Sequence, residues 1–210
     1  MISLSEILHT IAQALMIPCL IILIILMAGA VWQIGDIVVE YIAERRKHKC
    51  NVPQLLRDVH AAGADGLAEL IENSGLLRRQ KKALLELAES RGLPKDTLTA
   101  LAERLLATEE ARNARTTSIT DMIAKLGPMF GLLGTLIPLG PGIVALGQGD
   151  TVTLSESMIV AFDTTIAGVI SAAVASVISH IRKRWYNDDM VSLETLMEAV
   201  LEEVTADVEG

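Results

Sequence analysis

The sequence predicts an all-α integral membrane protein with three transmembrane helices and a helical cytoplasmic domain. Of its 210 residues, 51% are hydrophobic, and they are concentrated in long blocks rather than spread along the chain. Aromatic residues make up only 3%, too few for the aromatic girdles of a membrane β-barrel. A helix satisfies its own backbone hydrogen bonds in lipid, so each long apolar block is expected to be helical.

The first transmembrane helix is predicted at residues 14–35. Residues 14–32 carry no charge, and these nineteen residues are long enough to cross about 30 Å of hydrocarbon. No basic segment precedes them and no clear cleavage site follows, which favours a retained anchor over a signal peptide. The helix is expected to continue past Asp36 and Glu40 toward the basic residues 45–49. Cys19 and Cys50 fall at different depths, so no disulfide is expected between them.

The second and third transmembrane helices are predicted at residues 126–149 and 156–181, joined by an extracytoplasmic turn at 150–155. The second block is uncharged and holds seven Gly and three Pro, a content that a soluble helix would not tolerate. Membrane helices tolerate such residues, and small side chains let neighbouring backbones approach closely. The residues expected at such close contacts are Gly131, Gly134 and Gly168.

The distribution of Lys and Arg predicts the orientation. All eighteen lie at residues 45–49, 57–125 or 182–184. Cytoplasmic loops carry the excess of basic residues. The N-terminal residues 1–13 and the hairpin turn are therefore expected outside the cell membrane, with residues 36–125 and the C-terminus in the cytoplasm.

The cytoplasmic domain is expected to contain two or three helices. Pro53 opens the first, which ends near Gly75; the second stops at Gly92, and Pro94 opens the last. No strong breaker separates Pro94 from residue 127, so this helix can run unbroken into the second span.

The C-terminal segment 182–210 is predicted to be an acidic amphipathic helix. Residues 185–210 hold eight acidic residues and no Lys or Arg, which argues against nucleic acid as a partner. One apolar face is formed by Met190, Leu193, Met197, Val200, Leu201 and Val204. Such a face needs a partner surface, supplied by the cytoplasmic helices of this chain or of a neighbouring copy.

No catalytic constellation is visible in the sequence. The four His residues show no metal-ligand spacing, and there is no phosphate-binding loop or nucleophile–base pair. We therefore expect neither an enzyme nor a bound cofactor or metal.

Polar side chains inside the spans are the candidate functional groups, because burying them in lipid is costly. The candidates for an ion pathway are Thr135, Asp163, Thr164, Thr165 and Ser171. A face of small residues runs through Ala161, Thr164, Gly168, Ser171, Ala175 and Ser179. It suits close helix packing and a narrow wet path equally, and hydroxyls can also bond to their own helix. Asp163 is expected to face protein or water, either as an ion ligand or as a structural hydrogen-bond partner.

Two stretches carry a resemblance to a known family. GLLGTLIPLG at residues 131–140 and AFDTTIAGVISAAVAS at 161–176 resemble the MotA/TolQ/ExbB proton channel family. The layout of three spans, a large loop after the first and a cytoplasmic tail is similar to the ExbB/TolQ branch. The resemblance implies an oligomeric ring, typically a pentamer, around a single-span partner of the ExbD/TolR/MotB type that carries the titrating Asp.

The resemblance also implies a function and two residues that serve it. The family places pore-lining threonines at Thr135 and Thr165, and proton flow drives transport or envelope work through the partner. ExbB and TolQ carry a Glu where this chain has Val160, and Asp163 is a candidate to replace it. The sequence leaves open whether protons or sodium are carried. A non-conducting oligomeric scaffold and a stand-alone ion channel are the alternative functions.

Overall fold

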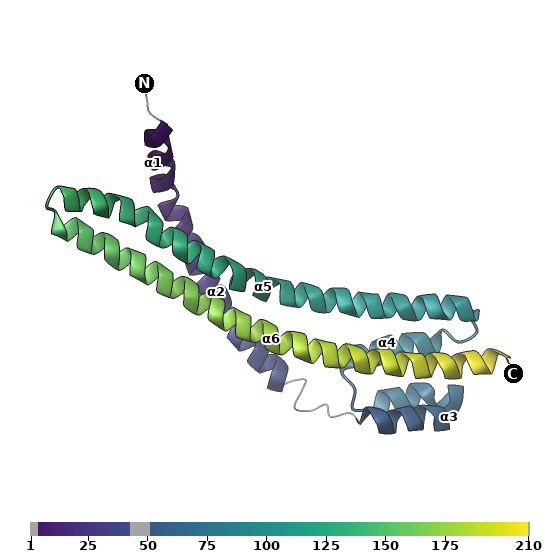
Figure 1. The fold of residues 1–210 in the computed structure, drawn as a ribbon. Coiled ribbons are helices and arrows are strands. Elements are labelled where there is room, and N and C mark those ends of the chain that lie inside the picture. Colours follow the sequence, from purple (N-terminus) through teal and green to yellow (C-terminus); the bar gives the residue numbers. More distant parts are fainter. Residues whose placement is uncertain (1–3, 43–50, 210) are drawn as a thin grey trace. The chain divides into compact units, whose positions relative to one another are not determined.

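The computed structural model describes residues 4–42 and 51–209, and the described chain is helical (Figure 1). The helices are α1 (Leu4–Ala14), α2 (Met16–Glu40), α3 (Val52–Asn73), α4 (Arg78–Glu89), α5 (Lys95–Gly147) and α6 (Thr151–Glu209). Within the described residues, three stretches are long and apolar enough to cross a membrane: Thr10–Glu40, Lys95–Gly147 and Thr151–Ala206. The all-α prediction is therefore confirmed, with three candidate membrane helices. The basic residues 45–49 and Cys50 lie outside the described residues.

The chain divides into two compact units. The membrane unit comprises Met1–Ile37 and Thr117–Ile181, and the bundle unit comprises Val38–Thr116 and Arg182–Gly210. The membrane unit holds the apolar blocks, and the bundle unit holds most of the charged residues.

The first helical segment of the membrane unit is interrupted at Leu15, one residue inside the predicted span. Pro18 explains the position, because proline has no N–H to donate to the carbonyl of Ala14 and its ring crowds that carbonyl. Helix α2 resumes at Met16 and continues to Glu40, past Asp36 as predicted. The N-terminal residues before the span, for which no structure was predicted, include the helix α1.

Helices α5 and α6 form an antiparallel hairpin (Figure 1). Its connection is shorter than the predicted turn 150–155, because Asp150 caps α6. One carboxylate oxygen accepts the backbone N–H groups of Val152 and Thr153 at 3.2 and 3.1 Å, and the other accepts the Thr153 hydroxyl at 2.6 Å. These hydrogen bonds hold the pKa of Asp150 below its usual value. Gly149 precedes the cap with φ of 77°, which glycine adopts without strain.

The bundle unit has one hydrophobic core built from four helices. Leu67 and Ile71 come from α3, Leu84 and Leu87 from α4, and Leu98 from α5. Helix α6 adds the predicted apolar face of the tail: Leu193, Met197, Val200 and Val204 are buried, and Met190 and Leu201 are partly buried. Burial of each large apolar side chain contributes roughly 1.5–3 kcal/mol. The amphipathic tail therefore packs against helices of its own chain.

The helix boundaries of the bundle unit follow the proline and glycine signals. Pro53 lies in the first turn of α3, and α5 begins directly after Pro94. Gly63 interrupts α3 with φ of 62° and ψ of 179°, a kink that the sequence did not predict. A residue with a β-carbon would be strained in that conformation. Helix α5 then runs without a break from Lys95 to Gly147, as the lack of a breaker allowed.

The end of α2 is joined to α6 by polar and aromatic contacts within the bundle unit. The Arg182 guanidinium donates to the Glu40 carboxylate at 3.1 Å, and the Arg182 side chain is 1% exposed. The Tyr41 and Trp185 rings are stacked, with centroids 6.1 Å apart. Burial and the neighbouring Glu40 raise the pKa of the Tyr186 hydroxyl to about 12.

Candidate ion pathway

The α5–α6 hairpin packs through glycines at backbone-to-backbone distance. A β-carbon placed on Gly168 would lie 2.5 Å from the carbonyl oxygen of Gly127 and 2.9 Å from the Cα of Gly131. One turn further along α5, a β-carbon on Gly134 would lie 2.5 Å from the β-carbon of Thr164. Real β-carbons do not approach other atoms this closely. These positions therefore require glycine as long as the two helices keep their separation.

The face of small residues predicted on α6 lies against other helices of the same chain. Its residues Ala161, Thr164, Gly168, Ser171, Ala175 and Ser179 are all buried. The Thr164 hydroxyl donates to the carbonyls of Val160 and Ala161, both at 2.9 Å, and the Ser171 hydroxyl donates to Ala167 at 2.7 Å. Of the two uses left open for this face, the single chain shows helix packing.

Thr135, Thr165 and Asp163 lie at the edge of this packed face or outside it. Thr135 and Thr165 are partly exposed in the single chain, and Asp163 is exposed. The Thr135 hydroxyl donates to the Leu132 carbonyl at 2.7 Å, and the Thr165 hydroxyl donates to the Ala161 carbonyl at 3.0 Å. A hydroxyl oxygen that donates one hydrogen bond still has lone pairs to offer water or a cation. These three residues can therefore meet water, lipid or another polypeptide.

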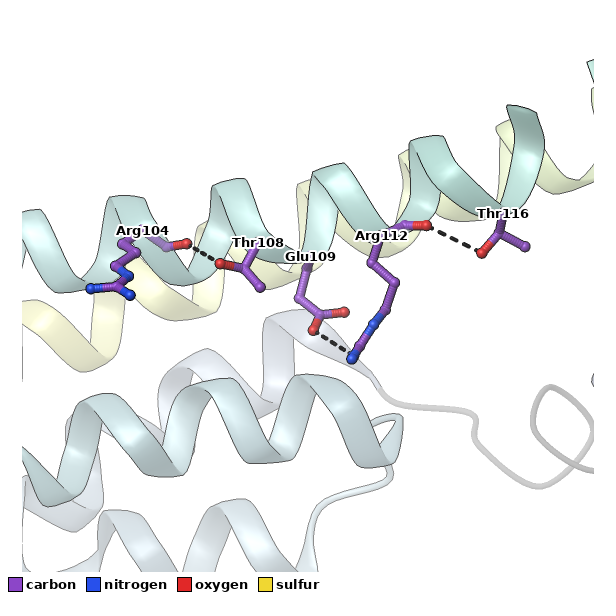
Figure 2. Close-up of polar contacts among 5 residues, drawn as sticks. All are labelled: Arg104, Thr108, Glu109, Arg112 and Thr116. Atoms are coloured by element: carbon purple, nitrogen blue, oxygen red, sulfur yellow. Dashed lines mark hydrogen bonds and ion pairs between the residues drawn. The ribbon is translucent and has the colours of Figure 1, made fainter. Parts of the chain in front are cut away.

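Hydrogen bonds from threonine to its own helix occur outside the spans as well. Figure 2 shows Thr108 donating to the Arg104 carbonyl at 2.7 Å and Thr116 donating to the Arg112 carbonyl at 3.1 Å, in the charged half of α5. The same segment carries an Arg112–Glu109 ion pair of 3.2 Å. The bond to the helix backbone therefore does not distinguish a pore threonine. What distinguishes Thr135 and Thr165 is their position in an apolar segment and their partial exposure.

Large apolar side chains are exposed next to these polar groups. On α5 they include Leu132 and Leu136, and on α6 they include Phe162 and Ile166, each between 56% and 59% exposed. Apolar surface of this extent needs lipid or protein around it. Val160, at the position of the ExbB/TolQ glutamate, is partly exposed on the same helix. The exposed carboxylate in this region is that of Asp163.

The structure also brings together residues that the sequence did not pair. The Ser179 hydroxyl donates to the carboxylate of Asp121 at 2.5 Å across the hairpin. Thr120 is completely buried, and Gln33 on α2 is 8% exposed. The signal in the sequence for this contact is a carboxylate shortly before an apolar block, and Asp121 falls within the range 36–125 that was predicted to be cytoplasmic. Among the described residues no three His, Cys, Asp or Glu side chains come together as a metal site.

Comparison with known proteins gives a family match and similarity to solved structures. The model of the MotA/TolQ/ExbB proton channel family matches residues 70–195, more than half of the chain. No curated protein sequence matches the chain. The fold is similar to a chain in the structure of the flagellar MotAB stator complex from Bacillus subtilis, with a TM-score of 0.57 and 19% identity. That similarity covers 87% of this chain and 77% of the other.

The family match at residues 70–195 includes both candidate membrane segments of the α5–α6 hairpin and the adjoining parts of the bundle unit. Members of this family are channels rather than enzymes, in agreement with the expectation from the sequence. The matched region includes Thr135, Asp163 and Thr165. With three candidate membrane helices and this match, the chain is a membrane protein that belongs to the MotA/TolQ/ExbB proton channel family.

Proposed function

We propose that the chain is the ring-forming subunit of an ion-driven membrane motor that energises a single-span partner. The observation that carries this proposal is the family match over residues 70–195, which contains both motif threonines. The fold similarity to a chain of the MotAB stator complex supports an assembly with a second protein. Moving one charge across 100 mV releases about 2.3 kcal/mol, so several charges per step would drive mechanical work.

The exposure of Asp163 supports an oligomer. A carboxylate facing lipid about 10 Å into a span would be costly or would remain protonated. A neighbouring copy, a partner helix or a water-filled lumen would remove that cost. The exposed apolar side chains of α5 and α6 provide surface for contacts between copies. A ring, pentameric as in the family, would place Thr135, Thr165 and Asp163 toward its lumen.

We further propose the ExbB/TolQ branch and a coupling proton. The three candidate spans fit that branch better than a four-span stator, and the distribution of Lys and Arg favours an extracytoplasmic N-terminus with a cytoplasmic C-terminus. The partner would be of the ExbD/TolR/MotB type and would bring the second titrating carboxylate. Asp163 would contribute the carboxylate that Val160 lacks. Thr164 and Ser171 are packed within the hairpin. They would not contact the ion directly, but would support the residues that line the path.

The experiment is ion flux into proteoliposomes that contain the assembled complex. Thr165→Val and Asp163→Asn should each assemble normally and lose most of the flux, because the first removes a water-orienting hydroxyl and the second removes a charge. Thr108→Val is the matched control, since Thr108 makes the same bond to its helix in the charged half of α5. Flux is measured once with a proton gradient and once with a sodium gradient, and the gradient that drives flux identifies the coupling ion. Full flux in both pathway variants would leave the scaffold as the better explanation, and flux without the partner would favour a stand-alone channel.

A further inference from the structure

A layer of buried polar side chains crosses the membrane unit on all three of its long helices. Gln33 on α2 is 8% exposed, Thr120 on α5 is 0% exposed and Ser179 on α6 is 3% exposed. Each lies three or four residues beyond a member of one apolar cluster: Ala30, Ile123 and Ala175. Residues three or four apart stack on the same helix face. The three polar side chains therefore form the next layer of the same three-helix core.

A carboxylate is bound at this layer. The Ser179 hydroxyl donates to Asp121, which lies 58 residues away in the sequence and next to Thr120. Asp121 is only partly exposed in the single chain. A hydrogen bond to the charged form of a carboxylate stabilises that form. The hairpin thus holds a partly buried acidic group at the edge of its packed core, hydrogen-bonded to a buried serine.

The Thr120 hydroxyl gives independent evidence for a ligand. Thr120 is completely buried, yet its oxygen has no hydrogen-bond partner among the described residues. The other span threonines, such as Thr164, donate to carbonyls of their own helix. Buried polar atoms almost always have a partner, and water or an ion is the partner when protein supplies none. Thr120 lies in the same layer as Ser179, whose hydroxyl binds Asp121, so an unpartnered oxygen and a carboxylate belong to one layer of the core. Oxygen ligands of this kind suit a small hard cation or its water.

The position of the pair relative to the motif threonines is regular. Asp121 precedes Thr135 by fourteen residues on α5, and Ser179 follows Thr165 by fourteen residues on α6. At 1.5 Å per residue this is about 21 Å along each helix. Thr135 is twelve residues from the end of α5 and Thr165 is fourteen residues from the start of α6, so the motif threonines lie near the middle of the hairpin. Asp121 and Ser179 therefore lie between them and the end of the membrane unit away from the turn, where a second site on one ion route would lie.

We propose that Asp121, Ser179 and Thr120 form a second binding station for the coupling cation, a proton or sodium, at the end of the membrane unit away from the hairpin turn. The carboxylate binds the cation, and the two hydroxyls supply further oxygen ligands or hold its water. This inference rests on the proposed ion-driven function and adds residues to it. The other titratable residues of the described membrane unit within about one turn of the layer are Asp36, Lys125 and His180.

The test uses the complete assembly with its single-span partner in proteoliposomes. Asp121→Asn keeps an oxygen that accepts the Ser179 hydrogen bond but removes the ionisable group. We expect flux to fall at least tenfold while the oligomer and its melting temperature stay unchanged. Asp150→Asn is the matched control and should conduct normally, because Asn also caps a helix. Ser179→Ala should move the pH midpoint of flux upward, since the charged carboxylate loses its donor.

A second readout does not depend on flux. Infrared difference spectra of the purified chain, recorded on acidification and on addition of sodium, should show a carboxyl band that Asp121→Asn removes and Thr120→Val shifts. The ion that produces the band identifies the coupling cation. Identical spectra in the wild type and Asp121→Asn would overturn the station, as would full flux in Asp121→Asn. If Thr165→Val blocks flux while Asp121→Asn does not, the proposed function stands and Asp121–Ser179 is only a clamp between helices.

Discussion

The Arg182 guanidinium is buried and donates to the carboxylate of Glu40 at 3.1 Å, so a charge pair joins the end of α2 to α6. The two residues are 142 positions apart in the sequence. The Glu40 side chain is 16% exposed, so little water is present that could take its place beside the Arg182 guanidinium. Removing one member of a buried pair leaves the other charge less well compensated, and that cost can exceed the value of the pair itself.

Glu40→Gln should therefore destabilise the protein by up to about 3–5 kcal/mol, the range for breaking a buried pair. The double variant Glu40→Leu with Arg182→Met should cost less, because it leaves no buried charge. The control is Glu109→Gln, since the Arg112 side chain of the Arg112–Glu109 pair is 54% exposed, and pairs open to water contribute about 0–1 kcal/mol (Figure 2). Denaturant unfolding in detergent measures all three. Equal effects at Glu40 and Glu109 would contradict the burial of Arg182.

The raised pKa of the Tyr186 hydroxyl predicts that the protein loses stability at high pH. Its folded-state pKa is raised to about 12, above the value of 10.0 for an unperturbed tyrosine, by burial and by Glu40. The folded state therefore holds the hydroxyl proton more tightly than the unfolded state. The protonated Tyr186 hydroxyl therefore contributes its full share to the free energy of unfolding below pH 10, and this share is lost as the pH rises toward 12. Melting temperatures should fall across this interval in the wild type, and the fall should be shallower in Tyr186→Phe. Parallel profiles for the two proteins would show that Tyr186 does not contribute.

The glycine contact of the hairpin predicts a large difference between two alanine substitutions. Gly168→Ala should destabilise the membrane unit by about 1–3 kcal/mol or prevent assembly, because its β-carbon would meet the backbone of Gly127 and Gly131. Gly140→Ala is the control in a span of the same hairpin, where nothing lies within 4 Å of the added carbon. It should cost much less than Gly168→Ala, because only the adjacent Pro141 crowds the added carbon. Thermal unfolding in lipid nanodiscs compares them, and similar melting temperatures would contradict the close approach.

The packing of the tail predicts that one face of α6 carries its stability. Met197 is 1% exposed in the bundle core, whereas Val191 on the same helix is 56% exposed. Met197→Ala should cost about 2–5 kcal/mol, the range for truncating a buried large residue. Val191→Ala should change stability by less than about 0.5 kcal/mol. Limited proteolysis of the C-terminal segment provides the measurement, and equal susceptibility of the two variants would be inconsistent with a packed tail.

Much of the fold was predictable from local patterns. The apolar blocks predicted the three membrane helices, and the prolines at 53 and 94 predicted where α3 and α5 begin. The apolar face through Met197 predicted a packed tail but not its partners, because the periodicity of one helix does not specify the surface that covers it. Gly63 and Asp150 were missed as a kink and a cap, since the same residue types also occur inside regular helices and turns.

The candidate site was less predictable than the fold. Composition identified the small-residue face on α6, but only the structure shows that Thr164 packs on Gly134 while Thr165, one residue on, remains partly exposed. Asp121 and Ser179 come from different helices of the hairpin and are 58 residues apart in the sequence, so no local spacing connects them. Their contact depends on the register of α5 against α6, which the glycines at 127, 131 and 168 determine.

The most direct test of the central claim is an experimental structure of the assembly purified from membranes with its partner. We predict a closed ring of copies around one or more single-span helices, with Thr135, Asp163 and Thr165 directed toward the lumen. Single dispersed copies, or a ring in which these three side chains face the surrounding lipid, would contradict the proposed ion-driven function.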